Sequence, residues 1–235
     1  MTALAYVGGE LELFARAHNW KAYLSAEICP FLHGDVLEVS AGMGAMTRAL
    51  AGCAARSWLC LEPDPNLAEL LDQQLKALPG PVPRTLRGGL VEDLPETAQF
   101  DSILYVDVLE HIERDAEEVR RVSRKLARGG HLIVLSPAHA FLMSAFDRSI
   151  GHHRRYDATS LRQLAPPELE LVRMRYLDSC GVFASLANRV MLRQSLPTAA
   201  QIAFWDQRIV PLSRRIDPWF AHRVGKSILA IWRKV

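Results

Sequence analysis

Residues 35–44 combine a buried acid with two glycines at the spacing of a nucleotide-binding turn. They read DVLEVSAGMG, an apolar strand that contains Glu38 and ends at Gly42 and Gly44. Glycine lets the backbone turn sharply and approach a ligand closely. Thr47 stands where the fingerprint of dinucleotide-binding proteins has its third glycine. The segment therefore predicts a ligand-binding turn, but not a standard NAD site.

A second acid, Glu62, ends the next apolar run at residues 57–61. A carboxylate at this place in a nucleotide-binding unit accepts hydrogen bonds from two ribose hydroxyls. Pro63 and Asp64 then end the strand and cap a helix predicted at residues 66–78. The alternative for Glu62 is a solvated strand end.

These residues resemble the first motif of the class I S-adenosylmethionine-dependent methyltransferases, acid-x-Gly-x-Gly-x-Gly. Glu38, Gly42 and Gly44 match it, and Ser40 replaces its first glycine. The resemblance implies that the loop surrounds the methionine part of S-adenosylmethionine, that the acid reaches its amino group directly or through water, and that residues 88–95 form the adenine loop. The predicted cofactor-binding residues are Glu38, Ser40, Ala41, Gly42, Gly44, Glu62, Pro63, Gly89, Leu90 and Asp107.

The string DSILYVDVLEH at residues 101–111 is the most family-specific in the chain. If this segment is helical, Asp107, Glu110 and His111 lie on one face. A similar acid-x-x-Glu-His arrangement binds metal in some ubiquinone-biosynthesis O-methyltransferases, whereas most relatives with this string need no metal. We expect no metal here and assign helix capping and supporting polar contacts to Glu110 and His111.

Residues 139–156 form an apolar segment dense with histidine, arginine, tyrosine and aspartate, which suits a pocket for an anionic or hydroxylated substrate. The segment resembles Ser-Ala-Phe-Asp…Gly-His-x-Arg-Arg-Tyr of a bacterial methyltransferase subgroup whose substrates are mostly unassigned. A base is needed only if the acceptor holds its proton at pH 7, where imidazole titrates. The predicted catalytic residues are His139, His152, Tyr156, Tyr176 and Asp147, and the predicted substrate contacts are Trp20, Tyr23, His111 and Arg155. The structural alternative is that the arginines pair with acids and that His153 is simply exposed.

Strand and helix patterns alternate five times between residues 35 and 137, which calls for a parallel sheet with ligands at the carboxyl ends of its strands. The predicted fold is α/β: a Rossmann-like seven-stranded, mostly parallel sheet with helices on both faces and an antiparallel last strand. We expect one domain over residues 1–235, with an N-terminal cap helix at 10–31, a core at 35–180, a helical insertion at 182–223 that forms part of a lid, and a final strand at 225–235.

The predicted insertion mixes arginines with aromatic residues. They are Arg189, Arg193, Arg208, Arg214, Arg215 and Arg223, with Trp205, Trp219 and Phe220 between them. Such a pattern suits contact with an anionic lipid surface or RNA, but a solvated helix face explains it more simply.

Composition limits the partners that we expect. The chain has 28 basic and 26 acidic residues, a net charge of only +2, which gives no general attraction for nucleic acid. Its four cysteines, Cys29, Cys53, Cys60 and Cys180, form no C-x-x-C pair and are expected to be reduced. No apolar run approaches a membrane span. We expect a cytoplasmic enzyme with a small-molecule substrate, no nucleic-acid partner and no stable membrane association; the oligomeric state stays open.

The resemblance implies transfer of a methyl group from S-adenosylmethionine to an oxygen, nitrogen or carbon of a small molecule by in-line displacement. Two alternatives stay open. One is an NAD-dependent oxidoreductase, against which Thr47 argues. The other is different chemistry on S-adenosylmethionine, such as an intramolecular alkylation that releases methylthioadenosine.

Overall fold

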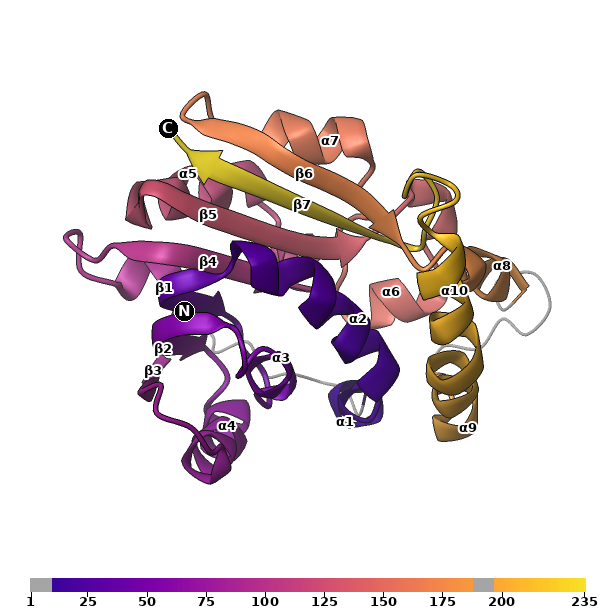
Figure 1. Ribbon diagram of the computed structural model, residues 1–235, viewed down its shortest axis with the longest axis horizontal. Coiled ribbons are helices and arrows are strands. Elements are labelled where there is room, and N and C mark those ends of the chain that lie inside the picture. The colour runs from indigo at the N-terminus through magenta and orange to yellow at the C-terminus, as the bar shows by residue number, and fades with distance from the viewer. Residues whose placement is uncertain (1–9, 188–196) are drawn as a thin grey trace.

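The computed structural model describes residues 10–187 and 197–235, and its centre is a seven-stranded sheet (Figure 1). The strand order is β3-β2-β1-β4-β5-β7-β6. Neighbours among β1 to β5 pair in parallel, while β7 runs antiparallel to both β5 and β6. The strands are β1 His33–Val39, β2 Ala54–Glu62, β3 Arg84–Gly88, β4 Phe100–Val106, β5 Leu126–Pro137, β6 Leu169–Leu177 and β7 Ser227–Lys234. The predicted fold class is confirmed.

Helices cover both faces of the sheet, and each face has its own apolar core. Successive residues of a strand point to opposite faces, so Val36 joins the core under α2, α3 and α4, and Leu37 joins the core under α5 and α7. The helices are α1 Glu10–Ala15, α2 His18–Ile28, α3 Ala45–Ala49, α4 Pro65–Ala77, α5 Asp115–Lys125, α6 Ala145–Ser149, α7 Ala158–Leu164, α8 Ser179–Ala187, α9 Ala199–Phe204 and α10 Val210–Ile216; a π-helical segment, Trp205–Ile209, joins α9 to α10. None of the described helices has the length and apolar character needed to cross a bilayer.

The N-terminal helix predicted at residues 10–31 is divided in two and ends earlier. A new helix, α2, starts at His18 because the carboxylate of Asp206 accepts the N–H groups of Asn19 and Trp20 (3.2 and 2.8 Å). This N-terminal cap comes from a residue far along the chain, so local sequence could not reveal it.

The prediction that Asp107, Glu110 and His111 share a face of an α-helix is wrong. The N–H of Asp107 still pairs with the carbonyl of Leu135 in β5 (2.9 Å), and Asp107 then adopts a left-handed conformation (φ 53°). Only a 3-10 turn, Leu109–His111, follows before α5.

The prediction of four reduced cysteines is also wrong, because Cys29 and Cys53 form a disulfide. Cys29 follows α2 and Cys53 follows α3. The two cysteines are 24 residues apart in sequence, so no short motif indicates their pairing. Cys60 and Cys180 are free. Arg189 and Arg193, which belong to the predicted insertion, lie outside the described residues.

Candidate functional site

A cavity of about 1150 Å³ lies at the carboxyl ends of β1, β2 and β4. This is where the strand order reverses around β1, the usual ligand position in open α/β sheets. Its walls come from the loops after these strands, from α1 and α2, from α6, and from α8, α9 and the π-helical segment. Typical ligand pockets measure about 300–1000 Å³, so the cavity has room for two ligands side by side.

Glu62 lies in the cavity wall with its carboxylate already oriented. One oxygen, Oε2, accepts the N–H of Gly42 (2.7 Å), and Oε1 accepts the N–H of Asp64 (3.0 Å). Each carboxylate oxygen has a second acceptor position, which leaves capacity for ligand hydroxyls. Burial raises the pKa of Glu62 above its ordinary value.

Glu38 also lines the cavity, although one of its oxygens is engaged by the protein. Oε2 accepts hydrogen bonds from the Thr47 hydroxyl (2.7 Å) and the Trp58 indole (2.9 Å), and burial raises the pKa of Glu38 to about 7. Thr47 thus holds the acid from the place where a dinucleotide fingerprint has glycine. The sequence shows this substitution, but not the hydrogen bond from Thr47 to Glu38.

The turn between β1 and α3 follows the predicted course. Ser40 and Gly42 both have left-handed backbone conformations (φ 50° and 56°), and both face the cavity. A Cβ on Gly44 would approach the Leu71 side chain at 2.7 Å, so this glycine permits close packing of α4 instead of lining the cavity.

Of the predicted cofactor residues, the structure brings Glu38, Ser40, Ala41, Gly42, Glu62, Pro63 and Asp107 to the cavity wall. Gly89 and Leu90 are not part of that wall. The N–H of Leu90 donates to Asp93 (2.7 Å), while the N–H of Gly89 points at the carbonyl of Glu62 (3.4 Å). They lie next to the ribose-binding candidate but outside the described cavity.

On the other side of the cavity, Asp147 organises a cluster of polar groups. Its Oδ1 contacts His152 Nδ1 (3.1 Å) and accepts from Arg155 Nη2 (2.7 Å), while Oδ2 accepts from the Ser144 hydroxyl (2.6 Å). Burial opposes ionisation of Asp147, but the hydrogen bond with His152, the charge of Arg155 and the hydrogen bond from Ser144 outweigh it and lower its pKa well below the usual range. The result is a fixed carboxylate that orients the imidazole of His152.

Glu110 lies beside His152 and is fully buried. Neither of its carboxyl oxygens has a hydrogen-bond partner among the described residues, and Oε1 is 3.9 Å from His152 Nε2. Burial, together with the charge of Asp107, raises the pKa of Glu110 well above its usual range. Burial thus favours the protonated form of this acid, which has one hydrogen bond to donate.

His111 completes this cluster, because its ring meets that of His152 edge to face with centroids 4.5 Å apart. Burial lowers the pKa of His111 to about 4, so its ring is neutral at pH 7. One ligand atom from each of Glu110, His111 and His152 lies within 4.8 Å of the others, and nitrogen and oxygen ligands at this spacing can hold a divalent ion.

Four of the predicted catalytic and substrate residues are not brought to the cavity. The ring of His139 stacks on that of Tyr176 (centroids 4.9 Å apart), whose hydroxyl accepts the N–H of Ala158. Tyr156 and Tyr23 are buried, and their hydroxyls donate to Asp115 (2.7 Å) and Asp217 (2.9 Å). The contacts of His139, Tyr156, Tyr176 and Tyr23 are packing contacts and hydrogen bonds within the protein, and the roles predicted for these residues stay untested. Trp20, His111, Asp147, His152 and Arg155 do line the cavity.

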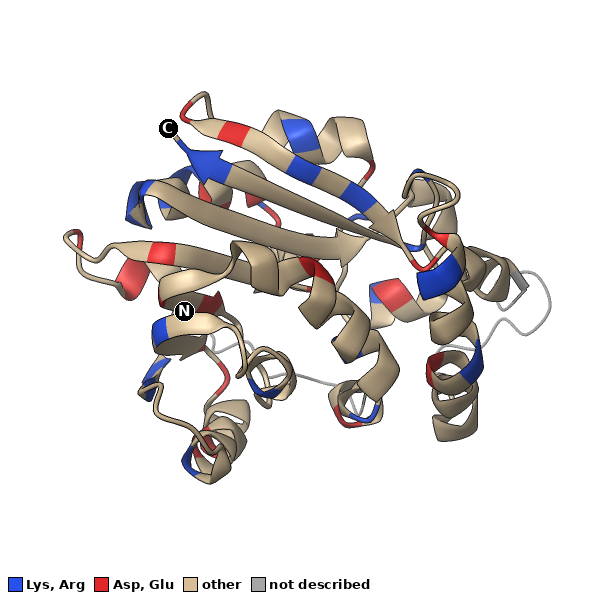
Figure 2. Cartoon of the chain, viewed as in Figure 1, with Lys and Arg blue, Asp and Glu red and all other residues tan. Residues whose placement is uncertain are grey.

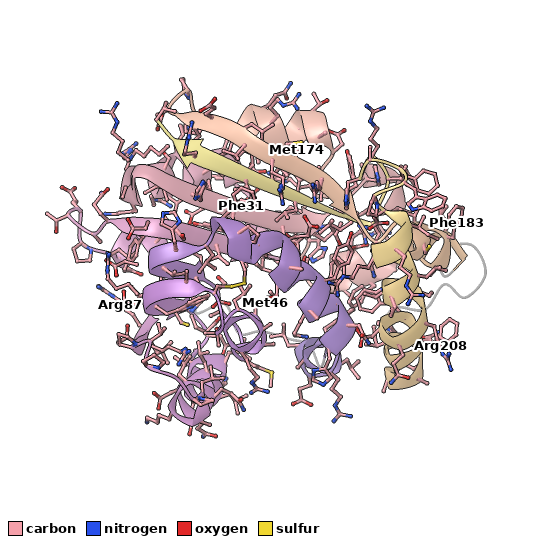
Figure 3. All side chains as sticks on the ribbon, in the orientation of Figure 1. Phe31, Met46, Arg87, Met174, Phe183 and Arg208 are labelled. Atoms are coloured by element: carbon pink, nitrogen blue, oxygen red, sulfur yellow. A yellow bond between two sulfur atoms is a disulfide. The ribbon has the colours of Figure 1, made fainter. Side chains whose placement is uncertain are left out.

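The lining residues Lys226, Trp205 and Met46 were given no role in the site by the sequence analysis. Lys226 lies 3.7 Å above the ring of Trp205 and 3.6 Å from Asp178, and burial lowers its pKa. Trp205 in turn lies against Phe14 and Trp20 (centroids 6.0 and 5.7 Å apart), forming an aromatic wall. Met46, at the cofactor side of the cavity, is labelled beside α3 in Figure 3. These groups come from both ends of the chain, so only the fold unites them.

Comparison with known proteins agrees with this geometry. Residues 37–132 match the family model of a methyltransferase domain. A search of curated proteins finds no match.

Among solved structures, the chain is similar to a complex of the Trm112 methyltransferase activator and a candidate methyltransferase from Haloferax volcanii (14% identity, 96% and 94% of the two chains covered, TM-score 0.64). It is also similar to the N-methyltransferase NodS from Bradyrhizobium japonicum with bound S-adenosylhomocysteine (16%, 94% and 87%, TM-score 0.58) and to the [4+2]-cyclase SpnF (17%, 92% and 80%, TM-score 0.61). Residues 37–132 thus resemble a methyltransferase domain, and the chain shares the Rossmann-like methyltransferase fold of these structures.

Proposed function

We propose that the protein transfers a methyl group from S-adenosylmethionine to an oxygen, nitrogen or carbon atom of a small molecule. S-adenosylmethionine is the cofactor of this methyltransferase domain, and its sulfonium supplies an activated methyl group. The observation that carries the proposal is that one cavity has an oriented carboxylate, Glu62, on one wall and an oriented imidazole, His152, on another. Cofactor and acceptor would then meet in a single cavity.

The first of these walls fits the cofactor. Glu62 would accept hydrogen bonds from the ribose hydroxyls, for which the N–H groups of Gly42 and Asp64 fix its orientation in advance. The loop from Ser40 to Gly42 would follow the methionine part, and the acids Glu38 and Asp107 would face its amino group. Glu38 is buried, and a cationic ligand would favour the ionised forms of both acids.

The polar cluster around His152 fits an acceptor that must lose a proton. The carboxylate of Asp147 accepts a hydrogen bond from the Nδ1–H of His152. The other ring nitrogen, Nε2, is then the one able to take a proton from the methyl acceptor. Arg155 and Ser144 hold Asp147 in place. Phe146, Leu142 and Ile150 of the same loop line the cavity and exclude water from the reacting atoms.

The test uses methyl-labelled S-adenosylmethionine with a small-molecule extract as the source of acceptor. We expect label in the small-molecule fraction and S-adenosylhomocysteine as the second product. His152→Gln should lower this turnover at least about 100-fold, with cofactor affinity nearly unchanged, because general-base catalysis contributes about 10²–10⁴-fold. His33→Gln, at an exposed histidine that begins β1 and does not line the cavity, serves as the control.

Intramolecular alkylation of the cofactor is the remaining alternative, and the similarity to a cyclase shows that this fold is not restricted to methyl transfer. An incubation of the protein with S-adenosylmethionine alone distinguishes methyl transfer from intramolecular alkylation. Release of methylthioadenosine without any acceptor would contradict methyl transfer, whereas S-adenosylhomocysteine formed only with extract supports it.

A further inference from the structure

The outer side of α9, α10 and the turn that follows carries arginines and exposed aromatic rings. We call this surface the basic aromatic face and define it by Arg208, Arg214, Arg215, Arg223, Trp219 and Phe220, all of which are exposed. Figure 2 shows blue segments along the column of α9 and α10, and Figure 3 shows Arg208 at this outer edge of the molecule. None of the four arginines has an ion pair within the part of the chain that the structure describes.

The charge of this face is one-sided because the nearby acids point inward. Residues 197–226 contain two acids, Asp206 and Asp217, and both are buried. Asp206 accepts the N–H groups at the start of α2, while Asp217 accepts the hydroxyl of Tyr23 (2.9 Å) and the N–H of Asp178 (2.8 Å). The carboxylates attach the helices to the body of the protein, so the arginines remain uncompensated outside.

On this face, apolar residues alternate with arginines along one side of the helix. Arg208, Leu212, Arg215 and Trp219 are separated by four, three and four residues, so they follow one side of α10 and its continuation. Trp219 is 90% exposed and Phe220 53%, in a turn closed by hydrogen bonds from Ala221 to Pro218 and from His222 to Asp217. Large rings at such exposure are costly in water and are typical of an interface.

A small cavity next to this stripe suits an anionic group. It measures about 350 Å³ and is lined by Asn19, Val210, Pro211, Arg214 and Arg215. Arg214 and Arg215 supply guanidinium groups and Asn19 an amide to the lining of one hollow, and these are donor types that bind phosphate.

We propose that the basic aromatic face docks the protein on the surface of an anionic lipid bilayer. The arginines would lie among the phosphate headgroups, with Trp219 and Phe220 at the boundary with the acyl chains, where amphipathic aromatic rings are favoured. The inner sides of α9 and the π-helical segment line the reaction cavity through Ile202 and Trp205. Docking would therefore bring a wall of that cavity to the bilayer surface.

Trp219 also provides an intrinsic fluorescence probe for testing whether the basic aromatic face binds to vesicles. Of the five tryptophans, Trp219 alone is exposed, whereas Trp20, Trp58, Trp205 and Trp232 are 8%, 1%, 7% and 2% exposed. A blue shift of tryptophan emission on adding vesicles would therefore report mainly on Trp219. Trp219→Phe keeps an aromatic ring and should remove the shift while binding continues.

The binding test measures, by flotation, how much full-length protein binds to two kinds of vesicle. One kind is neutral phosphatidylcholine, and the other contains about one third phosphatidylglycerol; each is used at low and at high salt. We expect the protein to bind to the anionic vesicles only, and we expect salt to weaken this binding. In Arg214→Glu/Arg215→Glu, affinity for the anionic vesicles should fall on the order of tenfold or more, because each basic residue contributes to attraction at an anionic surface. Arg120→Glu/Arg124→Glu, the same charge change on two exposed arginines of α5 across the sheet, should bind as the unmodified protein does.

Cofactor affinity and thermal melting identify any variant that fails to fold, and the Trp219→Phe emission test does not depend on the charge variants. The proposal is overturned by absence of binding to anionic vesicles, by equal binding to neutral ones, or by equal losses in the two double variants. Binding of the basic aromatic face to RNA or to a second copy of the chain, without vesicle binding, would also overturn it.

Discussion

Glu62 is the residue on which cofactor binding should depend most. Glu62→Ala removes a carboxylate that we place against two ribose hydroxyls, and loss of a charged hydrogen-bond partner costs about 1.5–3 kcal/mol. We expect affinity for S-adenosylmethionine, measured by calorimetry, to fall on the order of tenfold or more. Glu96→Ala, at an exposed loop position, is the control. Unchanged affinity in Glu62→Ala, with the fold intact, would refute the ribose assignment.

Ser40 occupies a backbone conformation that glycine adopts more easily. Its φ of 50° lies in the left-handed region, where a side chain costs about 1 kcal/mol. Ser40→Gly should therefore retain or slightly improve both stability and cofactor affinity, as judged by thermal melting and calorimetry. A clear loss of affinity would instead mean that the hydroxyl contacts the ligand, and would favour the alternative cofactor chemistry.

Glu38 should make stability depend on pH. Burial raises its pKa from 4.5 to about 7, so the folded protein holds a proton that the unfolded chain releases above pH 4.5. Its contribution is complete below pH 4.5 and is lost as the pH rises to about 7, a change on the order of 3 kcal/mol. Urea unfolding at pH 5 and 7.5 should show a smaller difference in Glu38→Gln than in the unmodified protein. An identical difference in both proteins would show that Glu38 does not titrate in this range.

Whether a site residue could be predicted from sequence depended on how local its contacts are. Glu38, Ser40 and Glu62 lie at the carboxyl ends of β1 and β2, which meet at one edge of the sheet, so their spacing and the resemblance of their motif were enough to predict them. His139 and Tyr176 have chemically suitable side chains, but they stack on each other away from the cavity. That outcome is decided by packing between β6 and the segment after β5, which no short motif encodes.

At the scale of elements, the strands were predictable and the N-terminal helices were not. The apolar runs at residues 36–39 and 57–61 are strands because they are buried between two helical layers. The break before α2 and the disulfide between Cys29 and Cys53 arise from contacts that fold-level packing creates. The short 3-10 turn after β4 likewise depends on Asp107 remaining paired with β5.

Asp206 is the clearest case of one element capping another. Asp206→Ala would leave the N–H groups of Asn19 and Trp20 without their acceptor, at a cost of about 2–3 kcal/mol. Asp206→Asn keeps one acceptor oxygen and should lose less. Chemical denaturation of the three proteins measures this order. Equal stability of Asp206→Ala and the unmodified protein would mean that α2 starts at His18 for another reason.

At the scale of the whole molecule, the reaction cavity is built from separated parts of the chain. The sheet supplies Glu62, the loop after β5 supplies His152, and the C-terminal helices supply Trp205. The residues that we propose for cofactor binding, from Glu38 to Asp107, lie within residues 37–132, the part that the methyltransferase family model matches. Asp147, His152 and Arg155 of the acceptor-facing wall come from outside it, whereas Glu110 and His111 lie within it, which is consistent with substrate choice depending mainly on the later segments.

Calorimetric titration of the full chain with S-adenosylmethionine, and separately with NAD, tests the central claim most directly. The account predicts saturable binding of S-adenosylmethionine at one site per chain and no binding of NAD, since Thr47 engages Glu38 where an NAD site has glycine. Binding of NAD with no response to S-adenosylmethionine would contradict it.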